Sequence, residues 1–185
     1  IGRYNDRWLA LMARVRQHPG KMTVAVVGAG AGGVELLLAM QFRLRHILHG
    51  LGRDAHEPVF HLFTDGADIL ATHNRGVRQR FEAVLQARKV VVHRNAAVTQ
   101  VMPGRLQTAG GDVLDADEIV WVTRAGGAAW LQGTGLALDE HGFIQVQDTL
   151  QTVSDPLVFA AGDIASMVNH PLEKAGVFAV RQGPP

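Results

Sequence analysis

The sequence predicts an α/β fold with a parallel β-sheet, and two patterns carry this prediction. A short apolar run rich in β-branched residues, 24–27, suits a central strand that is buried on both faces. It leads directly into a glycine pattern, G-x-G-x-x-G, and then into an apolar helical pattern from Val34. A strand at 59–64, a helix at 75–88 and a strand at 89–94 complete the order β-α-β-α-β. This order is typical of a Rossmann-like dinucleotide-binding domain.

Each glycine of the pattern has a physical role in such a domain. Gly28 allows the tight turn out of the strand, Gly30 lets the backbone approach a pyrophosphate, and Gly33 lets the helix pack close to the strand. The helix N-terminus adds free N–H groups and a positive dipole end, which favour phosphate. A glycine-rich turn without a ligand is the alternative, but the preceding strand and the following helix give the context that the motif requires. The residues expected to contact the dinucleotide here are Gly28, Ala29, Gly30, Ala31, Gly32 and Gly33.

The elements on either side follow from hydrophobic spacing. Residues 4–17 are predicted to form a helix, because apolar side chains fall on one stripe and arginines on the other face. This lead-in helix occupies 1–20, and the helix after the glycine turn is expected over 31–48. Beyond residue 94, segments split by Pro-Gly and Gly-Gly predict a small antiparallel β-meander, after which a buried strand returns to the parallel sheet. These segments are 97–102, 105–109, 112–114 and 118–123.

A second module is predicted after a glycine-rich stretch at 126–135, which holds a short helix around Trp130. Its strands are expected at 142–146 and 157–163, and a helix at 173–182. The predicted divisions are therefore a lead-in helix at 1–20, a dinucleotide-binding domain at 21–133 and a C-terminal module at 134–185. The tryptophans Trp8, Trp121 and Trp130 are expected to lie in the core.

The end of the second strand is where an acidic side chain would bind the adenosine ribose. Thr64 and Asp65 are the candidates. Asp65 is equally well explained as a turn residue before Gly66, because aspartate favours such turns. The ribose and turn interpretations of Asp65 both stay open at this point.

Composition excludes several other classes of function. A net charge of +1 gives no electrostatic reason to expect nucleic acid as a partner. The absence of cysteine excludes disulfides and thiolate metal sites, and it is compatible with a reducing, cytoplasmic setting. His46 and His49 lie three residues apart on one helix, but no acidic partner follows at a helical spacing, and the helix dipole explains cations at this end. No metal site is therefore predicted.

Three stretches together resemble the FAD-dependent pyridine nucleotide-disulfide oxidoreductase family. The first is V-V-G-A-G-A-G-G-V-E, which ends in Glu35 and is similar to the NAD(P)H-binding motif. The second, W-V-T-R at 121–124, is similar to a strand-end motif, and the third, V-F-A-A-G-D-I-A at 158–165, to the second FAD motif. The C-terminal run 170–184 resembles the type II NADH dehydrogenase-like branch, and most of all the oxidoreductase domain fused to selenophosphate synthetase (selenide, water dikinase).

The resemblance implies further site residues. Glu35 would lie near the nicotinamide end of the cofactor in a positioning role, and Asp163 would contact the FAD ribityl chain. Arg124 stands where the strand-end motif usually has glycine, so a long cation would crowd that corner. The helix that starts near Lys174 would lie by the flavin ring. Together these residues are Glu35, Thr123, Arg124, Gly162, Asp163, Lys174 and Ala175.

The function implied is NAD(P)H binding and hydride transfer to FAD, with no catalytic side chain identified. The family's FAD domain has a first half that should precede residue 1, so the module 134–185 is expected to be an incomplete FAD-binding piece. The chain alone is then expected to be inactive and to self-associate through uncovered sheet edges. The electron acceptor is open, with a quinone as one candidate and the inner face of the membrane as the matching location. The alternative is a non-catalytic dinucleotide-binding regulatory module attached to another enzyme such as selenophosphate synthetase.

Overall fold

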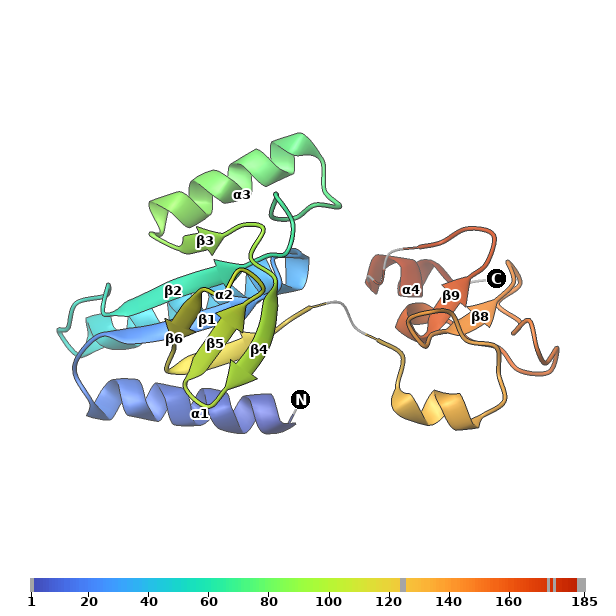
Figure 1. Cartoon of the computed structure of the whole chain (residues 1–185), viewed down its shortest axis with the longest axis horizontal. Coiled ribbons are helices and arrows are strands. Elements are labelled where there is room, and N and C mark those ends of the chain that lie inside the picture. The colour runs from blue at the N-terminus through green and yellow to red at the C-terminus, as the bar shows by residue number, and fades with distance from the viewer. Residues whose placement is uncertain (1, 124–125, 173, 175, 183–185) are drawn as a thin grey trace. The chain divides into compact units, whose positions relative to one another are not determined.

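The computed structural model describes residues 2–123, 126–172, 174 and 176–182 (Figure 1). It divides the chain into two compact units, Ile1–Arg124 and Ala125–Pro185, each of which is described by itself. The division comes before the boundary expected at 133/134, and packing explains the difference. Leu131 of the short helix packs with Ile144 and Val146 in the core of the second unit.

The first unit is built on a four-stranded parallel sheet in the order β3-β2-β1-β7. The strands are β1 Met22–Val27, β2 Pro58–Phe63, β3 Val91–His93 and β7 Glu118–Trp121. Val27, the last residue of β1, is in register with Phe63 on one side and with Trp121 on the other. The carboxyl ends of β1, β2 and β7 therefore meet at one edge of the sheet. The return of β7 to the parallel sheet confirms the sequence prediction.

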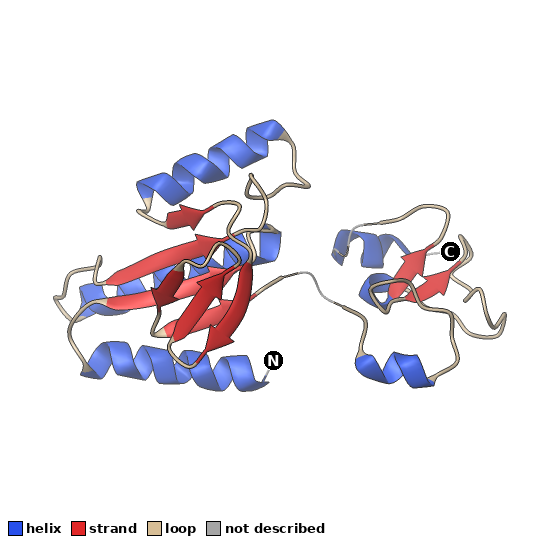
Figure 2. Ribbon diagram, viewed as in Figure 1, coloured by secondary structure: helices blue, strands red, loops and turns tan. Residues whose placement is uncertain are grey.

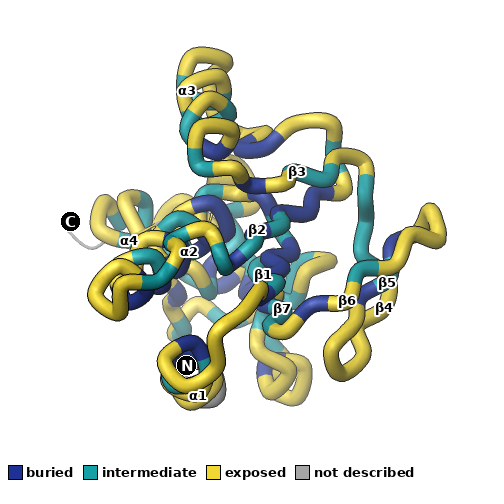
Figure 3. Tube along the Cα trace, turned by 90° about the vertical axis from the view of Figure 1, so that its left-hand side faces the viewer, coloured by how far each residue is buried: buried dark blue, intermediate teal, exposed yellow. Residues whose placement is uncertain are grey.

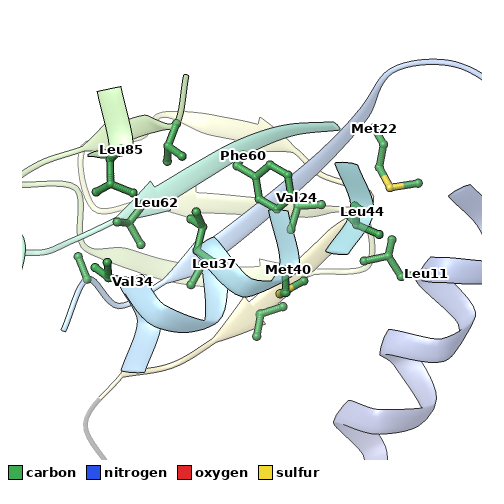
Figure 4. Packing of buried hydrophobic residues seen from close by; sticks show 14 of the residues in the cluster. Leu11, Met22, Val24, Val34, Leu37, Met40, Leu44, Phe60, Leu62 and Leu85 are labelled. Atoms are coloured by element: carbon green, nitrogen blue, oxygen red, sulfur yellow. The ribbon is translucent and has the colours of Figure 1, made fainter. Parts of the chain in front are cut away.

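Three helices complete the hydrophobic core with one face of this sheet: α1 Gly2–Gln17, α2 Ala31–Gly50 and α3 Arg75–Ala87. Figure 4 shows Leu37 and Met40 of α2 packed toward Val24 of β1, with Phe60 of β2 beside them. Full burial of a side chain of this size contributes about 1.5–3 kcal/mol. The i, i+3 spacing of the apolar residues on α2 thus fixes how the helix lies on the sheet.

The opposite face is covered by a three-stranded antiparallel meander, which appears among the red strands of Figure 2. Its strands are β4 Val98–Met102, β5 Arg105–Thr108 and β6 Val113–Asp115. Leu106 of β5 is fully buried against Ala25 and Phe63 of the parallel sheet. The sheet is therefore buried on both faces, as the apolar run at 24–27 predicts, and the burial map of Figure 3 shows this central position of β1 and β2.

Helix α1 belongs to the first unit rather than standing apart from it. Its buried residues Leu11 and Val15 join the same core as α2. Arg53, in the loop after α2, donates hydrogen bonds to the carbonyl oxygens of Val15 and His18 and forms an ion pair with Glu57. In the part of the chain that the structure describes, no helix combines the length and the apolar character needed to cross a bilayer.

The second unit is smaller and has little regular structure. It contains η1 Ala129–Gly133, β8 Ile144–Val146, η2 Gly162–Ile164, β9 Ala165–Met167 and α4 Gly176–Gln182. Strands β8 and β9 pair in parallel. The strand predicted at 157–163 is wrong: Phe159 forms only an isolated bridge with Gln151, and Leu157 is 88% exposed. The turn at 155–157 and the short partner segment leave no ladder long enough for a strand.

Candidate functional site

The carboxyl edge of the parallel sheet is shaped by the glycine turn between β1 and α2. Gly28 has a φ of 112°, in the region that favours glycine, and a Cβ there would lie 2.2 Å from the carbonyl oxygen of Val122. A Cβ on Gly33 would lie 1.8 Å from the carbonyl oxygen of Gly28. Both glycines are therefore required by the packing of the turn against its neighbours.

Gly30 is different, because nothing in the fold requires it to be glycine. Among the residues that the structure describes, no heavy atom lies within 4 Å of the position of a Cβ on this residue. Its φ of −72° and ψ of −178° are extended backbone that any residue adopts. The missing side chain leaves open space over the turn, which is what the close approach of a pyrophosphate needs.

Helix α2 points its N-terminus at this open space. Gly30 is its N-cap, and the intrahelical bonds begin with the N–H of Val34 donating to the carbonyl oxygen of Gly30 at 3.0 Å. The first N–H groups of a helix, here those of Ala31 to Gly33, have no intrahelical acceptor. The first turn holds no acidic side chain to neutralise the positive dipole end. The turn can therefore accept an anionic phosphate through backbone groups.

The two ribose candidates after β2 take different roles. Thr64 is buried: its N–H donates to the carbonyl oxygen of His93 at 2.9 Å, and its Oγ1 accepts from the N–H of Gly66 at 3.3 Å. The side-chain bond within this turn thus comes from Thr64, while Asp65 is exposed. Thr64 therefore holds the turn, and Asp65 is the exposed carboxylate of the two candidates.

The residues after β7 lie beside the glycine turn. The N–H of Val122 donates to the carbonyl oxygen of Val27 at 2.7 Å, which continues the pairing of β7 with β1. Thr123 is exposed, and its Oγ1 accepts the indole N–H of Trp121 at 2.5 Å. Glu35 is also exposed, on α2. Arg124 and Ala175 lie outside the described residues.

Two of the three tryptophans are not in the core, contrary to the sequence prediction. Trp121 is 52% exposed and Trp130 is 66% exposed, whereas Trp8 packs partly buried against the core of the first unit. Trp121 ends a short strand at the edge of the sheet, beyond the buried Val120, so the core does not reach its ring.

A histidine pair beside the carboxyl edge was not expected from the sequence. His61 Nδ1 and His93 Nε2 lie 2.9 Å apart, and the His93 ring stacks on Phe63 with 4.2 Å between centroids. Burial lowers the pKa of both imidazoles; His93 lowers that of His61 further, while Asp112 partly opposes the shift of His93. The signal was present as H-x-F in one strand and V-x-H in the next, since period-two alternation and parallel register bring these side chains together.

In the second unit, the residues of the predicted FAD motif gather around the start of η2. The N–H of Gly162, at a φ of 74°, donates to Oε1 of Gln182 at 2.7 Å. Lys174 Nζ donates to the carbonyl oxygen of Ala165 and lies 4.2 Å from the centroid of the Phe143 ring. Burial lowers the pKa of Lys174, and the charges of Asp139 and Asp163 oppose that shift.

Asp163 is near enough for its charge to act on Lys174, and both residues lie largely at the surface. Gln182 is not among the site residues expected from the sequence, although it lies in the run 170–184. Within the described ranges, no three His, Asp or Glu side chains come together in an arrangement that could hold a metal ion.

Comparison with known proteins gives a consistent result. The model of the family described as pyridine nucleotide-disulphide oxidoreductase matches residues 3–183. The chain is 31% identical over 144 residues to an NADH dehydrogenase-like protein of Mycobacterium tuberculosis, which covers 78% of this chain and 36% of that protein. It is 29% identical over 151 residues to the type II NADH:quinone oxidoreductase of Haemophilus influenzae, and the match covers 80% of this chain and 34% of that protein. The chain thus spans about a third of the length of these relatives.

Solved structures show the same fold at low sequence identity. NDH2 from Plasmodium falciparum in complex with NADH matches with a TM-score of 0.67 and 16% identity, over 84% of this chain and 34% of that one. A ferredoxin reductase from Rhodopseudomonas palustris matches with a TM-score of 0.71 and 18% identity, over 94% of this chain and 41% of that one.

Proposed function

The chain belongs to the pyridine nucleotide-disulphide oxidoreductase family, and from this membership we propose that it is the NAD(P)H-binding portion of an FAD-dependent oxidoreductase of the NADH dehydrogenase-like type. The observation that carries the proposal is the open position over Gly30, at the N-terminus of a 20-residue helix. Packing explains Gly28 and Gly33 without a ligand, whereas no packing contact requires Gly30, and the open space there supports the approach of a ligand.

The first unit supplies the contacts to the dinucleotide. The turn from Gly28 to Gly33 would hold the pyrophosphate through backbone N–H groups and the dipole of α2. Asp65 would accept hydrogen bonds from the adenosine ribose, and Glu35 and Thr123 would position the opposite end. When bound, the dinucleotide supplies a hydride and the flavin accepts it, so the work of this chain is binding and orientation.

The second unit would contribute one wall of a flavin site. Asp163 offers a carboxylate to the ribityl hydroxyls, and Lys174 holds the segment before α4 against Ala165. Arg124 and Ala175 belong to the proposed contacts on the strength of the sequence motifs alone. The matched stretch covers only 36% and 34% of the two relatives, which supports placing the remaining FAD contacts in the part of the relatives that this chain does not span.

The relatives support a proposal for the acceptor and for the cellular setting. We assign a quinone as acceptor, because one relative is named as an NADH:quinone oxidoreductase. Quinones reside in the bilayer, so the whole protein would work at the inner face of the cytoplasmic membrane. The run 170–184 supports fusion to selenophosphate synthetase, and in such a fusion a purely regulatory module is the second candidate. The stretch A-A-G-D at 160–163, which resembles part of the FAD motif, argues against it, since a dinucleotide sensor does not need that motif.

The test of this function compares two glycines that are equally open to a side chain. Gly30→Val fills the approach to the turn, while Gly50→Val adds the same side chain at the far end of α2, also with no heavy atom within 4 Å. In calorimetric titrations with NADH and with ADP-ribose, Gly30→Val should lose more than about tenfold in affinity relative to the wild type, about 1.4 kcal/mol, while Gly50→Val should keep the wild-type affinity. Equal binding by Gly30→Val and the wild type would refute the proposed function.

A further inference from the structure

The order of the strands fixes where the two halves of a bound dinucleotide would lie. Strand β1 stands between β2 and β7, and the carboxyl ends of all three are in register. A pyrophosphate on the turn after β1 sends one nucleoside over β2 and the other over β7. Asp65 follows β2 and suits the adenosine ribose. The nicotinamide nucleoside must then extend over the end of β7, which is the edge formed by Trp121 and Thr123.

Trp121 is an unusual residue for this edge. The residue before it, Val120, is buried, but the indole ring of Trp121 is 52% exposed. Its only polar atom, Nε1, donates to Thr123 Oγ1 at 2.5 Å. This bond satisfies the indole N–H and fixes the ring orientation, while about half of the residue stays exposed. An exposed aromatic ring that is already oriented loses little freedom when a flat ligand stacks on it.

We propose that Trp121, oriented by Thr123, is the stacking platform for the nicotinamide ring of the bound dinucleotide; this inference rests on the proposed function. Stacking of a planar ring on an aromatic side chain is favourable whatever the ring. The oxidised nicotinamide ring also carries a positive charge, which is attracted to the face of an indole, the best aromatic partner for a cation. Trp121 therefore favours NAD⁺ over NADH, so it biases this half of the site toward the oxidised cofactor.

Trp130 provides a matched control. It is at least as exposed as Trp121 but belongs to the second unit, whereas the glycine turn belongs to the first. Trp130→Phe should leave every binding constant unchanged. Trp121→Leu removes the platform, Trp121→Phe keeps a smaller one, and Thr123→Val removes the acceptor of the indole N–H with little change in shape.

The experiment is a titration of the whole chain and these variants with NAD⁺, NADH and ADP-ribose, which lacks the nicotinamide ring. Trp121→Leu should weaken NAD⁺ binding about three- to tenfold and NADH binding less, while ADP-ribose binding is unchanged. Trp121→Phe should restore most of the loss, and Thr123→Val should give an intermediate value. Quenching of tryptophan fluorescence by NAD⁺ should persist in Trp130→Phe and disappear in Trp121→Leu.

The outcomes separate this inference from the proposed function. If the wild type binds ADP-ribose in a manner that depends on Gly30, but Trp121→Leu binds NAD⁺ as the wild type does, the stacking platform is refuted and the proposed function stands. Equal weakening of ADP-ribose and NAD⁺ in Trp121→Leu would show a structural role and would also refute it. If the wild type binds neither ligand, both the proposed function and the platform fail.

Discussion

Replacing Gly33 by alanine should destabilise the first unit, although the same change normally stabilises a helix. Glycine inside a helix is less favourable than alanine by roughly 0.5–1 kcal/mol. At Gly33, however, the new Cβ would lie 1.8 Å from the carbonyl oxygen of Gly28, and Cβ atoms essentially never approach other atoms closer than 3.0 Å. The clash is with backbone rather than with a flexible side chain, so α2 must move away from the end of β1.

Such overpacking costs about 1–3 kcal/mol, and we expect the upper end of that range at Gly33 because the helix moves as a rigid element. A loss of about 3 kcal/mol lowers the Tm of a chain of this size by roughly 6–12 °C. The matched control is Gly32→Ala, one residue earlier, where the new Cβ would meet a methyl group of Val122 at 3.7 Å, an ordinary contact. Gly32→Ala should be neutral or stabilising by up to about 1 kcal/mol.

Thermal unfolding followed by circular dichroism measures the difference between these two variants. The change in Tm should be negative for Gly33→Ala and zero or positive for Gly32→Ala, although the two neighbouring positions carry the same substitution. If Gly33→Ala unfolds at the same temperature as Gly32→Ala, the close approach of α2 to β1 is not as described, and the structural reason for this glycine is wrong.

Three further predictions follow from the same structure. The pKa values of His61 and His93 are lowered in the folded state, so the unfolded chain binds more protons as the pH falls below 6.5, and stability decreases on acidification. Between pH 7.5 and 5.5 the Tm should therefore fall less in a double variant with glutamine at both positions than in the wild type. An equal fall of Tm in both proteins would contradict the lowered pKa values. NADH should bind more tightly than NADPH, because the 2′-phosphate of NADPH would face the carboxylate of Asp65. Asp65→Asn should reduce the ratio of the two dissociation constants by up to about fivefold, about 1 kcal/mol. Tighter binding of NADPH than of NADH by the wild type in calorimetry would contradict this prediction. After incubation with FAD and desalting, the chain should retain no visible flavin absorbance. One charge-assisted hydrogen bond to Asp163 contributes about 1.5–3 kcal/mol, which does not offset the cost of at least about 4 kcal/mol for the translational and rotational freedom lost on association. A stoichiometric flavin spectrum would contradict this and show that the FAD site is complete.

The sequence was sufficient for the first unit because each signal there is local and agrees with its neighbours. The run 24–27 is buried on both faces as its composition predicts, and Gly28 and Gly33 make the close contacts expected of the motif. The meander is confirmed as well, because Pro-Gly and Gly-Gly pairs specify turns through backbone conformation alone. Periodicity and turn chemistry thus specify the fold of this unit.

The second unit shows where such reasoning fails. The apolar composition of 157–163 predicts a strand, yet Leu157 and Phe159 are exposed. Composition cannot show whether a pairing partner of sufficient length exists. Strand β9, Ala165–Met167, had no signal, since Ala-Ser-Met has low β-propensity and forms a strand only through its pairing with β8.

The site was predicted as a set of residues but not as an arrangement. Thr64 and Asp65 were equivalent in the sequence, and only the hydrogen bond from Gly66 to Thr64 separates the structural residue from the exposed carboxylate. The exposure of Trp121 depends on where the core ends, which hydrophobicity does not encode. Contacts between strands, such as the histidine pair, require the register as well as the pattern.

The central claim is that the glycine turn of the first unit binds a dinucleotide through the N-terminus of α2. A titration of ¹⁵N-labelled chain with ADP-ribose, followed by amide chemical shifts, tests it most directly. We expect the largest shifts on the amides of Gly30 to Gly33, with a second group at Asp65, and no shift on the amides of the second unit. Saturable binding whose shifts fall around Gly162 and Lys174 instead, or no shift at the glycine turn at any concentration of ADP-ribose, would contradict it.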